Sequence, residues 1–274
     1  MVRGEWGEAA SAVRAAVQNL GYTVREVERL AGSSGNPSWR VGTVEGTFAV
    51  RLYPPSEAGT AHGLARLAEA LRAGSYPVPG VVRVSETESY VALVQEWAPG
   101  VPLAVALEEA PERAHALGLT VGETHAWLHA LPVLPEAHAA LRVLDGPTGA
   151  PASPSWLHLD YHPLNVLVED EQVSAVLDWE NVALGDARLD VTRTLSILSV
   201  DPAVWSLSGA RRRTLLLFRR GYLEGYARGG GRLEGLPPFL AWAGDFMRRD
   251  LGGRFTEGEL RHVTRWTRAW AFRS

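Results

Sequence analysis

Apolar residues follow two different spacings along the first hundred residues. Positions 5–20 repeat apolar side chains at helical spacing and end at Gly21, which predicts an amphipathic helix. A second stripe predicts a helix from about Ser56 to Ala73. The first part of the chain is therefore predicted to combine two helices with short strands, which β-branched and aromatic runs place near 22–30, 39–41, 47–52, 81–85 and 90–95.

Beyond Gly100 the pattern becomes mainly helical. Another helix is predicted to open at Gly185-Asp186, where Asp186 is a natural N-cap. Apolar positions at helical spacing predict the other helices near 102–109, 112–131, 136–143, 209–228, 238–250 and 256–271.

Residues 156–180 carry the most informative polar pattern of the chain. Two short β-branched runs around the polar turn 169–172 predict a hairpin. Asn165 precedes this hairpin and Asp178 ends it, so we expect the two residues to lie close together. Asp160 could orient an attacking hydroxyl and accept its proton, while Asn165 and Asp178 offer hard oxygen ligands to Mg²⁺. Phosphoryl transfer needs groups of these kinds.

This stretch resembles the aminoglycoside phosphotransferase and choline kinase superfamily, which are small-molecule kinases. The matching residues are His158, Asp160, His162, Asn165, Asp178-Trp179-Glu180, Gly185-Asp186 and Asp190. Leu159 departs from the pattern, since the family usually has Gly there. The resemblance implies a two-lobed α+β fold of protein-kinase type. Its nucleotide-binding lobe, residues 1–95, would be an antiparallel sheet with one main helix. Its catalytic and acceptor-binding lobe, residues 96–274, would be mostly helical.

The resemblance places nucleotide-binding residues in the first lobe. Arg51 would contact the α- and β-phosphates, although a solvent-facing Arg on a strand is the alternative. The backbone of Gln95, Glu96 and Trp97 would bind the adenine edge, although the same residues could simply end a buried strand. A loop that would lie over the phosphates, or be an ordinary hairpin turn, contains Gly32, Ser33, Ser34, Gly35 and Asn36.

Three features leave further alternatives open. The family's usual Glu partner for the phosphate-binding cation falls near 60–62, where there is no carboxylate, so either Glu57 serves or the pair is missing. His125 and His129 lie on one helix face, which suits a zinc pair, but a helix-face or core role is favoured without an HExxH arrangement. Asp190 is either a buried anchor of the catalytic loop or an exposed first-turn residue favoured by the helix dipole.

Composition narrows the classes of function. The 274 residues are 46% hydrophobic, enough for a large core, and the absence of cysteine excludes disulfides, thiolate metal sites and a Cys nucleophile. No apolar run approaches a membrane span and the first residues lack a signal-peptide layout, so we expect a cytoplasmic protein without membrane contact. A net charge of −4 and the lack of a recognisable module disfavour nucleic-acid binding.

Charge is distributed unevenly between the two ends of the chain. All 27 basic residues are Arg, and residues 201–274 carry a net +7 against −11 for residues 1–200. In the family the last helices shape the acceptor pocket, and a polycationic aminoglycoside would prefer an acidic one. We therefore expect a neutral or anionic hydroxylated metabolite, or a large apolar hydroxylated compound. The acidic residues of 108–123 would reverse this preference if they lined the pocket.

The function predicted from the sequence is ATP-dependent transfer of the γ-phosphoryl group to a hydroxyl of a small molecule, with ATP and Mg²⁺ as cofactors. Asp160 would be the catalytic residue, and Asn165 and Asp178 would bind the metal. One alternative is a kinase-fold nucleotide-binding protein with little or no turnover, which the missing Glu partner of Arg51 suggests. Another is a metal-dependent hydrolase using His158, Asp160, His162 and Asp178.

Overall fold

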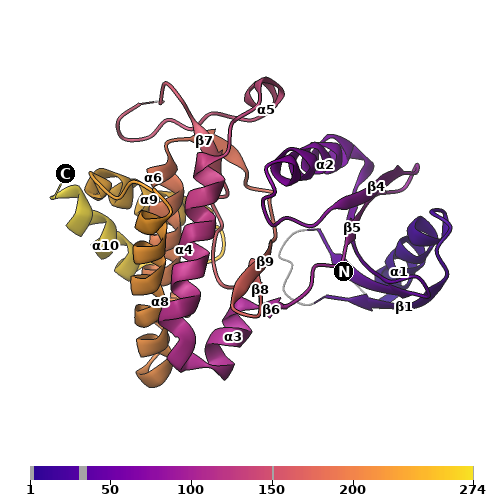
Figure 1. The fold of residues 1–274 in the computed structure, drawn as a ribbon, viewed down its shortest axis with the longest axis horizontal. Coiled ribbons are helices and arrows are strands. Elements are labelled where there is room, and N and C mark those ends of the chain that lie inside the picture. The colour runs from indigo at the N-terminus through magenta and orange to yellow at the C-terminus, as the bar shows by residue number, and fades with distance from the viewer. Residues whose placement is uncertain (1–2, 31–35, 150, 274) are drawn as a thin grey trace. The chain divides into compact units, whose positions relative to one another are not determined.

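The computed structural model describes residues 3–30, 36–149 and 151–273, and the chain divides into two compact units, Met1–Ala98 and Pro99–Ser274 (Figure 1). Gly32, Ser33, Ser34 and Gly35 of the expected phosphate loop lie outside the described residues. Among the described helices, none combines the length and apolar character that crossing a membrane requires.

The first unit is built on a five-stranded antiparallel sheet of order β1-β2-β3-β5-β4. Its strands are β1 (Val24–Arg29), β2 (Ser38–Thr43), β3 (Thr47–Tyr53), β4 (Val81–Glu86) and β5 (Val91–Glu96). Helix α1 (Arg3–Gln18) packs along β1, and α2 (Ala58–Ala73), which follows the short 3₁₀ turn η1 (Pro55–Glu57), packs along β4 (Figure 1). The predicted antiparallel sheet is confirmed.

Strand β5, an interior strand of the sheet, is buried at four successive positions because helices cover both faces of the sheet. Ala92 and Val94 belong to the core that includes Val13 and Val17 of α1. The alternate residues Val91 and Leu93 pack against Ala61 of α2. Side chains of a strand point alternately to its two faces, so a strand covered on both sides reads as one continuous apolar run.

The second unit is mainly helical, as predicted. A hairpin of β8 (Val166–Glu169) and β9 (Gln172–Val176) confirms the one expected from the sequence, and β6 (Val101–Pro102) pairs with its β8 edge. The helices are α3 (Leu103–Glu109), α4 (Ala114–Ala130), α5 (Pro135–Ala140), α6 (Ala187–Val200), α7 (Pro202–Trp205), α8 (Gly209–Arg228), α9 (Leu236–Leu251) and α10 (Arg261–Ala271), with a 3₁₀ turn η2 (Pro111–Arg113) before α4.

A further strand pair surrounds the catalytic stretch and was not predicted. Strand β7 (Ser155–Leu157) pairs antiparallel with β10 (Ala183–Gly185), and β7 leads directly into residues 158–165. Because β10 precedes α6, this pair holds the start of the loop beside the start of that helix.

Helices α4 and α8 run side by side, and glycines set their separation (Figure 1). A methyl group on Gly122 would fall on the carbonyl oxygen of Tyr222, and one on Gly225 would fall on that of Leu119. Without side chains at these positions the two backbones approach closely. The approach brings the histidines of α4 within reach of the tyrosines of α8.

Candidate active site

The loop between β7 and β8 joins Asp160 to Asn165. The Asn165 amide Nδ2 donates to the Asp160 carbonyl oxygen at 3.0 Å and to its carboxylate Oδ2 at 3.1 Å. The Asn165 carbonyl oxygen in turn accepts from the backbone N–H of Leu177 at 2.8 Å. Leu177 directly precedes Asp178, so the hairpin brings Asn165 and Asp178 to one end, as predicted.

Asp160 is partly exposed and placed to be ionised at neutral pH. Burial acts to raise its pKa, but the hydrogen bond and charge of His162, together with His158 and Arg193, hold the pKa below its usual value. His162 Nε2 lies 3.4 Å from Asp160 Oδ1. An ionised carboxylate of low basicity is better suited to accepting a hydrogen bond from a hydroxyl than to removing its proton early.

His158 supports the loop from inside. Its side chain is fully buried, with Nε2 donating to the Leu177 carbonyl at 2.8 Å and Nδ1 accepting the backbone N–H of Asp160 at 3.2 Å. Burial lowers its pKa, which keeps the ring neutral and suits one donating and one accepting nitrogen. His158 therefore ties the loop to the end of β9.

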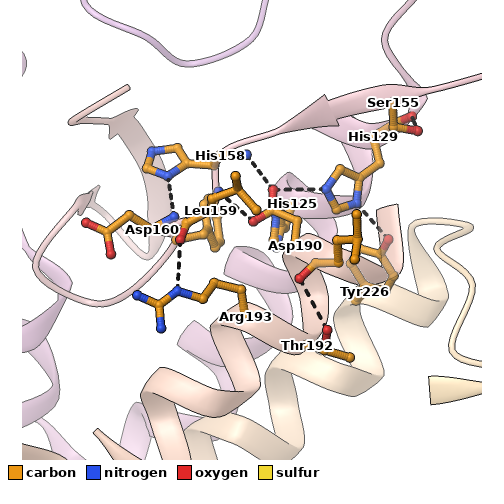
Figure 2. A network of polar contacts seen from close by, with 12 residues as sticks. His125, His129, Ser155, His158, Leu159, Asp160, Asp190, Thr192, Arg193 and Tyr226 are labelled. Atoms are coloured by element: carbon orange, nitrogen blue, oxygen red, sulfur yellow. Dashed lines mark hydrogen bonds and ion pairs between the residues drawn. The ribbon is translucent and has the colours of Figure 1, made fainter. Parts of the chain in front are cut away.

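Asp190, in the first turn of α6, binds the backbone of the same loop. Its Oδ2 accepts the backbone N–H of His158 at 2.5 Å, and its Oδ1 accepts that of Leu159 at 2.8 Å (Figure 2). The Asp190 side chain is completely buried. This agrees with the prediction of a buried anchor and contradicts the alternative of an exposed first-turn residue. Asp186 caps the helix through the backbone N–H of Arg188 at 2.9 Å, as predicted.

Two histidines of α4 also donate to Asp190, each backed by a tyrosine of α8. His125 Nε2 lies 3.1 Å and His129 Nε2 lies 3.3 Å from Asp190 Oδ2. Their Nδ1 atoms accept from the hydroxyls of Tyr222 at 2.8 Å and Tyr226 at 2.7 Å. These three groups are close enough to hold a metal ion, but hydrogen bonds already use both nitrogens of each ring. The arrangement therefore favours the core role over the zinc pair.

Burial and hydrogen bonding shift the pKa of several groups in this network. Burial acts to raise the pKa of Asp190, but its electrostatic and hydrogen-bond interactions with His125 and His129 hold it well below the usual range. Burial lowers the pKa of His125 to about 4, so the ring is neutral at pH 7. Burial also raises the pKa of Tyr222 and Tyr226, which keeps both hydroxyls protonated and able to donate. The sequence identified the two histidines but gave no sign of their tyrosine partners.

Leu159 keeps the loop geometry that a Gly would adopt. Its φ of 63° lies in the left-handed region, which costs an L side chain about 1–2 kcal/mol. The side chain is buried in a cluster with Leu157, Leu189 and Phe239, and burying a leucine contributes about 1.5–3 kcal/mol. Packing therefore offsets the backbone strain at the position where this chain departs from the family pattern.

A second charged residue under the loop, Arg193, was missed by sequence reasoning. This α6 side chain is only 5% exposed. Its Nε donates to the Leu159 carbonyl at 3.3 Å (Figure 2). Its Nη2 lies 2.9 Å from Asp250 Oδ2 of α9. An Arg among apolar helix positions resembles a surface residue in sequence, so only the fold reveals its burial.

The first unit places several of the expected nucleotide-binding residues on neighbouring strands. Arg51 of β3 shares the α2 side of the sheet with its strand partner Leu93, and its Nε donates to Ser38 Oγ at 3.1 Å. Asn36 Nδ2 donates to Glu57 Oε2 at 3.0 Å. At the end of β5 the Glu96 backbone N–H donates to the Gly80 carbonyl at 2.8 Å, so that donor is engaged within the unit.

The buried histidine predicts how stability depends on pH. Between pH 6.5 and 4 the unfolded chain binds a proton at His125 that the folded protein does not, so acidification lowers the free energy of unfolding. From these two pKa values the loss reaches about 3 kcal/mol. We expect urea titrations of His125→Gln to show a shallower fall over this range than wild type. His138→Gln, at an exposed histidine of α5, should keep the wild-type slope. Identical slopes in His125→Gln and wild type would contradict the assignment.

Comparison with known proteins gives a family for the sequence. The model of a family described as phosphotransferase enzyme family matches residues 26–144 and 134–236. No curated protein matches the chain in sequence.

Solved structures with the same fold include several phosphotransferases. Aminoglycoside phosphotransferase APH(4)-Ia is 14% identical with a TM-score of 0.67, covering 96% of this chain and 98% of its own. Macrolide 2′-phosphotransferase MphH from Brachybacterium faecium is 17% identical with a TM-score of 0.59, covering 93% and 96%. Aminoglycoside-3′-phosphotransferase of type VIII is 20% identical with a TM-score of 0.59, covering 85% and 96%. At these identities the likeness establishes the fold.

Proposed function

Because the chain belongs to the phosphotransferase enzyme family, we propose that it moves the γ-phosphoryl group of ATP to a hydroxyl of a small molecule. The observation that carries the proposal is the hydrogen-bonded group of Asp160, Asn165 and the end of β9. A thermostable mutant of APH(4)-Ia, which shares the fold, has been solved in a ternary complex with AMP-PNP and hygromycin B, an ATP analogue and a hydroxylated acceptor.

Asp160 would orient the acceptor hydroxyl. The bond between the acceptor oxygen and the γ-phosphorus forms as the bond to the β,γ-bridging oxygen breaks, and ADP leaves. The hydroxyl proton passes to Asp160. Most of the catalytic effect in such reactions comes from positioning and charge stabilisation, so a carboxylate of lowered pKa can serve as this late proton acceptor.

Asn165 and Asp178 fit a magnesium ion by their chemistry. The Asn165 Nδ2 is engaged by Asp160, which directs the amide oxygen Oδ1 away from that contact. Together with the Asp178 carboxylate this gives two hard oxygen donors, the ligand type that Mg²⁺ prefers. When bound, the ion neutralises charge on the nucleotide's phosphates.

The nucleotide would be held by residues of the first unit. Arg51 would contact the α- and β-phosphates with the loop of residues 32–36. With the Glu96 N–H engaged by Gly80, the Glu96 carbonyl and the backbone of Gln95 and Trp97 are the groups proposed for the adenine edge. These assignments rest on the family and on the placement of β3 and β5 side by side.

The experiment that tests the function is ADP release from MgATP in the presence of a panel of acceptors. The panel should include hygromycin B, a macrolide, neutral sugars and sugar acids, because the solved relatives act on aminoglycosides and a macrolide. We expect ADP and a phosphorylated product in equal amounts with at least one acceptor. ATP binding without ADP release would favour the nucleotide-binding alternative, and cleavage of a phosphoester without ATP would favour a hydrolase.

Asp178→Asn should weaken magnesium-dependent nucleotide binding, because it removes a carboxylate charge beside the phosphates. We expect calorimetry to give an MgATP Kd at least about tenfold higher than that of wild type, which corresponds to the loss of one charged contact. Asp245→Asn, at an exposed carboxylate of α9, is the matched control and should bind as wild type does. Equal MgATP affinity in Asp178→Asn and wild type would remove Asp178 from the metal site.

A further inference from the structure

The peptide group that joins Leu159 to Asp160 is held at both ends. The Leu159 carbonyl accepts from Arg193 Nε at 3.3 Å, and the Asp160 N–H donates to His158 Nδ1 at 3.2 Å (Figure 2). A peptide group is planar, so two hydrogen bonds on its opposite sides fix how it is rotated about the chain. This rotation sets the backbone from which the Asp160 side chain projects.

Helix α6 contacts both backbone groups of Leu159 from one face. Asp190 Oδ1 accepts the Leu159 N–H at 2.8 Å, and Arg193 binds the Leu159 carbonyl. Asp190 and Arg193 are three residues apart, a spacing that places side chains next to each other on a helix. An acceptor and a donor from α6 therefore hold the residue whose φ of 63° is strained for an L side chain.

Helix α9 holds Arg193 in turn. The Arg193 Nη2 lies 2.9 Å from Asp250 Oδ2, and the Arg193 Cζ lies 5.1 Å from the centre of the Phe246 ring. Phe246 and Asp250 are four residues apart, so both approach from the same face of α9. A buried apolar cluster between α6 and α9 keeps the two helices in contact. The contacts therefore run from α9 through one guanidinium to the peptide group that precedes Asp160.

The stability of the fold does not by itself account for an arginine at this position. Arg193 is only 5% exposed, and burial lowers its pKa because a charged group is costly to remove from water. Its buried Nη1 has no hydrogen-bond partner among the residues that the structure describes. Apolar side chains of similar volume often stabilise a protein as well as a buried ion pair does. A guanidinium, in contrast, binds a carbonyl and a carboxylate at once with fixed geometry.

We propose that Arg193 and Asp250 are positioning residues for phosphoryl transfer. Arg193 holds the Leu159–Asp160 peptide in the orientation that directs Asp160 toward the acceptor hydroxyl, and Asp250 acts through Arg193. The role in transfer rests on the proposed function, whereas the effect on the loop does not depend on turnover. An exposed carboxylate of α9 should therefore influence the rate of the reaction without touching the acceptor or the nucleotide.

Asp250→Asn is the first test, because this side chain is 42% exposed and the substitution should leave the protein folded. We expect kcat to fall by about threefold to tenfold while the MgATP Kd stays unchanged, since the amide binds the guanidinium more weakly and the loop loses part of its support. Asp245→Asn makes the same change at another exposed position of α9 and should keep the wild-type kcat. An unchanged kcat in Asp250→Asn would overturn the proposal.

A double substitution tests whether Asp250 acts through Arg193. Arg193→Met should lower kcat by about tenfold to a hundredfold. Adding Asp250→Asn to Arg193→Met should cause no further loss, because the side chain through which Asp250 acts is already gone. A structural role would instead lower the free energy of unfolding in urea and leave the kcat of the folded protein unchanged. Equal losses of kcat from Asp250→Asn in the two backgrounds would contradict the proposal, and Asp250→Asn stays decisive if Arg193→Met does not fold.

Hydrogen exchange followed by mass spectrometry separates this proposal from the proposed function. We expect peptides that cover residues 157–165 to exchange faster in Asp250→Asn than in wild type or Asp245→Asn, with peptides of α4 unchanged. Unchanged exchange of the loop would overturn the proposal whether or not an acceptor is known. Faster exchange in a protein that releases no ADP with any acceptor would contradict the proposed phosphotransfer alone.

Discussion

Asp160→Asn is expected to lower kcat by about 10²–10⁴ with any acceptor that wild type phosphorylates, while the MgATP Kd stays nearly unchanged. The amide keeps the size of the side chain but loses the charge that accepts the hydroxyl's hydrogen bond and proton. The Asn165 Nδ2 contact at 3.1 Å can still be made to the amide oxygen, so the loop should keep its shape.

The control for this substitution is Asp170→Asn in the turn between β8 and β9. Asp170 is exposed and has a φ of 48°, a left-handed conformation that Asn also adopts readily. It undergoes the same chemical change in the hairpin that follows the Asp160 loop and should leave kcat unchanged. An Asp160→Asn enzyme with near-normal turnover would show that another group orients the acceptor.

The family and the meeting of Asn165 with Asp178 were predictable because the residues that indicate them lie close together in the sequence. Asp160, Asn165 and Asp178 fall within nineteen residues, and a hairpin of two β-branched runs decides which of them meet. The phosphotransferase family match confirms the resemblance drawn from this stretch. The confirmed fold followed from the same resemblance together with apolar spacing in the long helices.

The histidine–tyrosine pairs that support Asp190 were not predictable, since they join distant helices. His125 and Tyr222 are 97 residues apart, as are His129 and Tyr226. Their meeting depends on the glycine contact between α4 and α8, and a single glycine in a helix does not reveal its packing partner. Strands β7 and β10 have three residues each, too few to give a periodic signal.

The carboxylates of Asp160 and Asp190 differ in what they can contact. Asp160 reaches solvent, where the proposed acceptor would meet it, whereas Asp190 is completely buried and its described contacts are with protein donors. An acidic residue with two backbone and two imidazole donors is satisfied without water, which is why a fully buried charge is tolerated there. The anchor of the loop and the proposed catalytic residue are therefore separate side chains, and each can be tested by itself.

Asp190→Ala should be the most destabilising single change at the site, lowering the free energy of unfolding by about 3–5 kcal/mol. Four N–H donors, from His158, Leu159, His125 and His129, would lose their shared acceptor in a site without solvent. Each unsatisfied donor costs about 1–3 kcal/mol, less where the side chains can turn to other partners. Asp190→Asn keeps one acceptor oxygen and should fall between this variant and wild type.

Asp186→Ala is the control, four residues earlier on the same helix. It removes the N-cap of α6 and should cost only about 0.5–2 kcal/mol, because its carboxylate is partly exposed. Urea titrations followed by tryptophan fluorescence give both values. The expected order follows from the number of buried donors that lose their acceptor and from whether water can replace the carboxylate. If Asp190→Ala were no less stable than Asp186→Ala, the loop would be held by His158 and Arg193 without the Asp190 anchor.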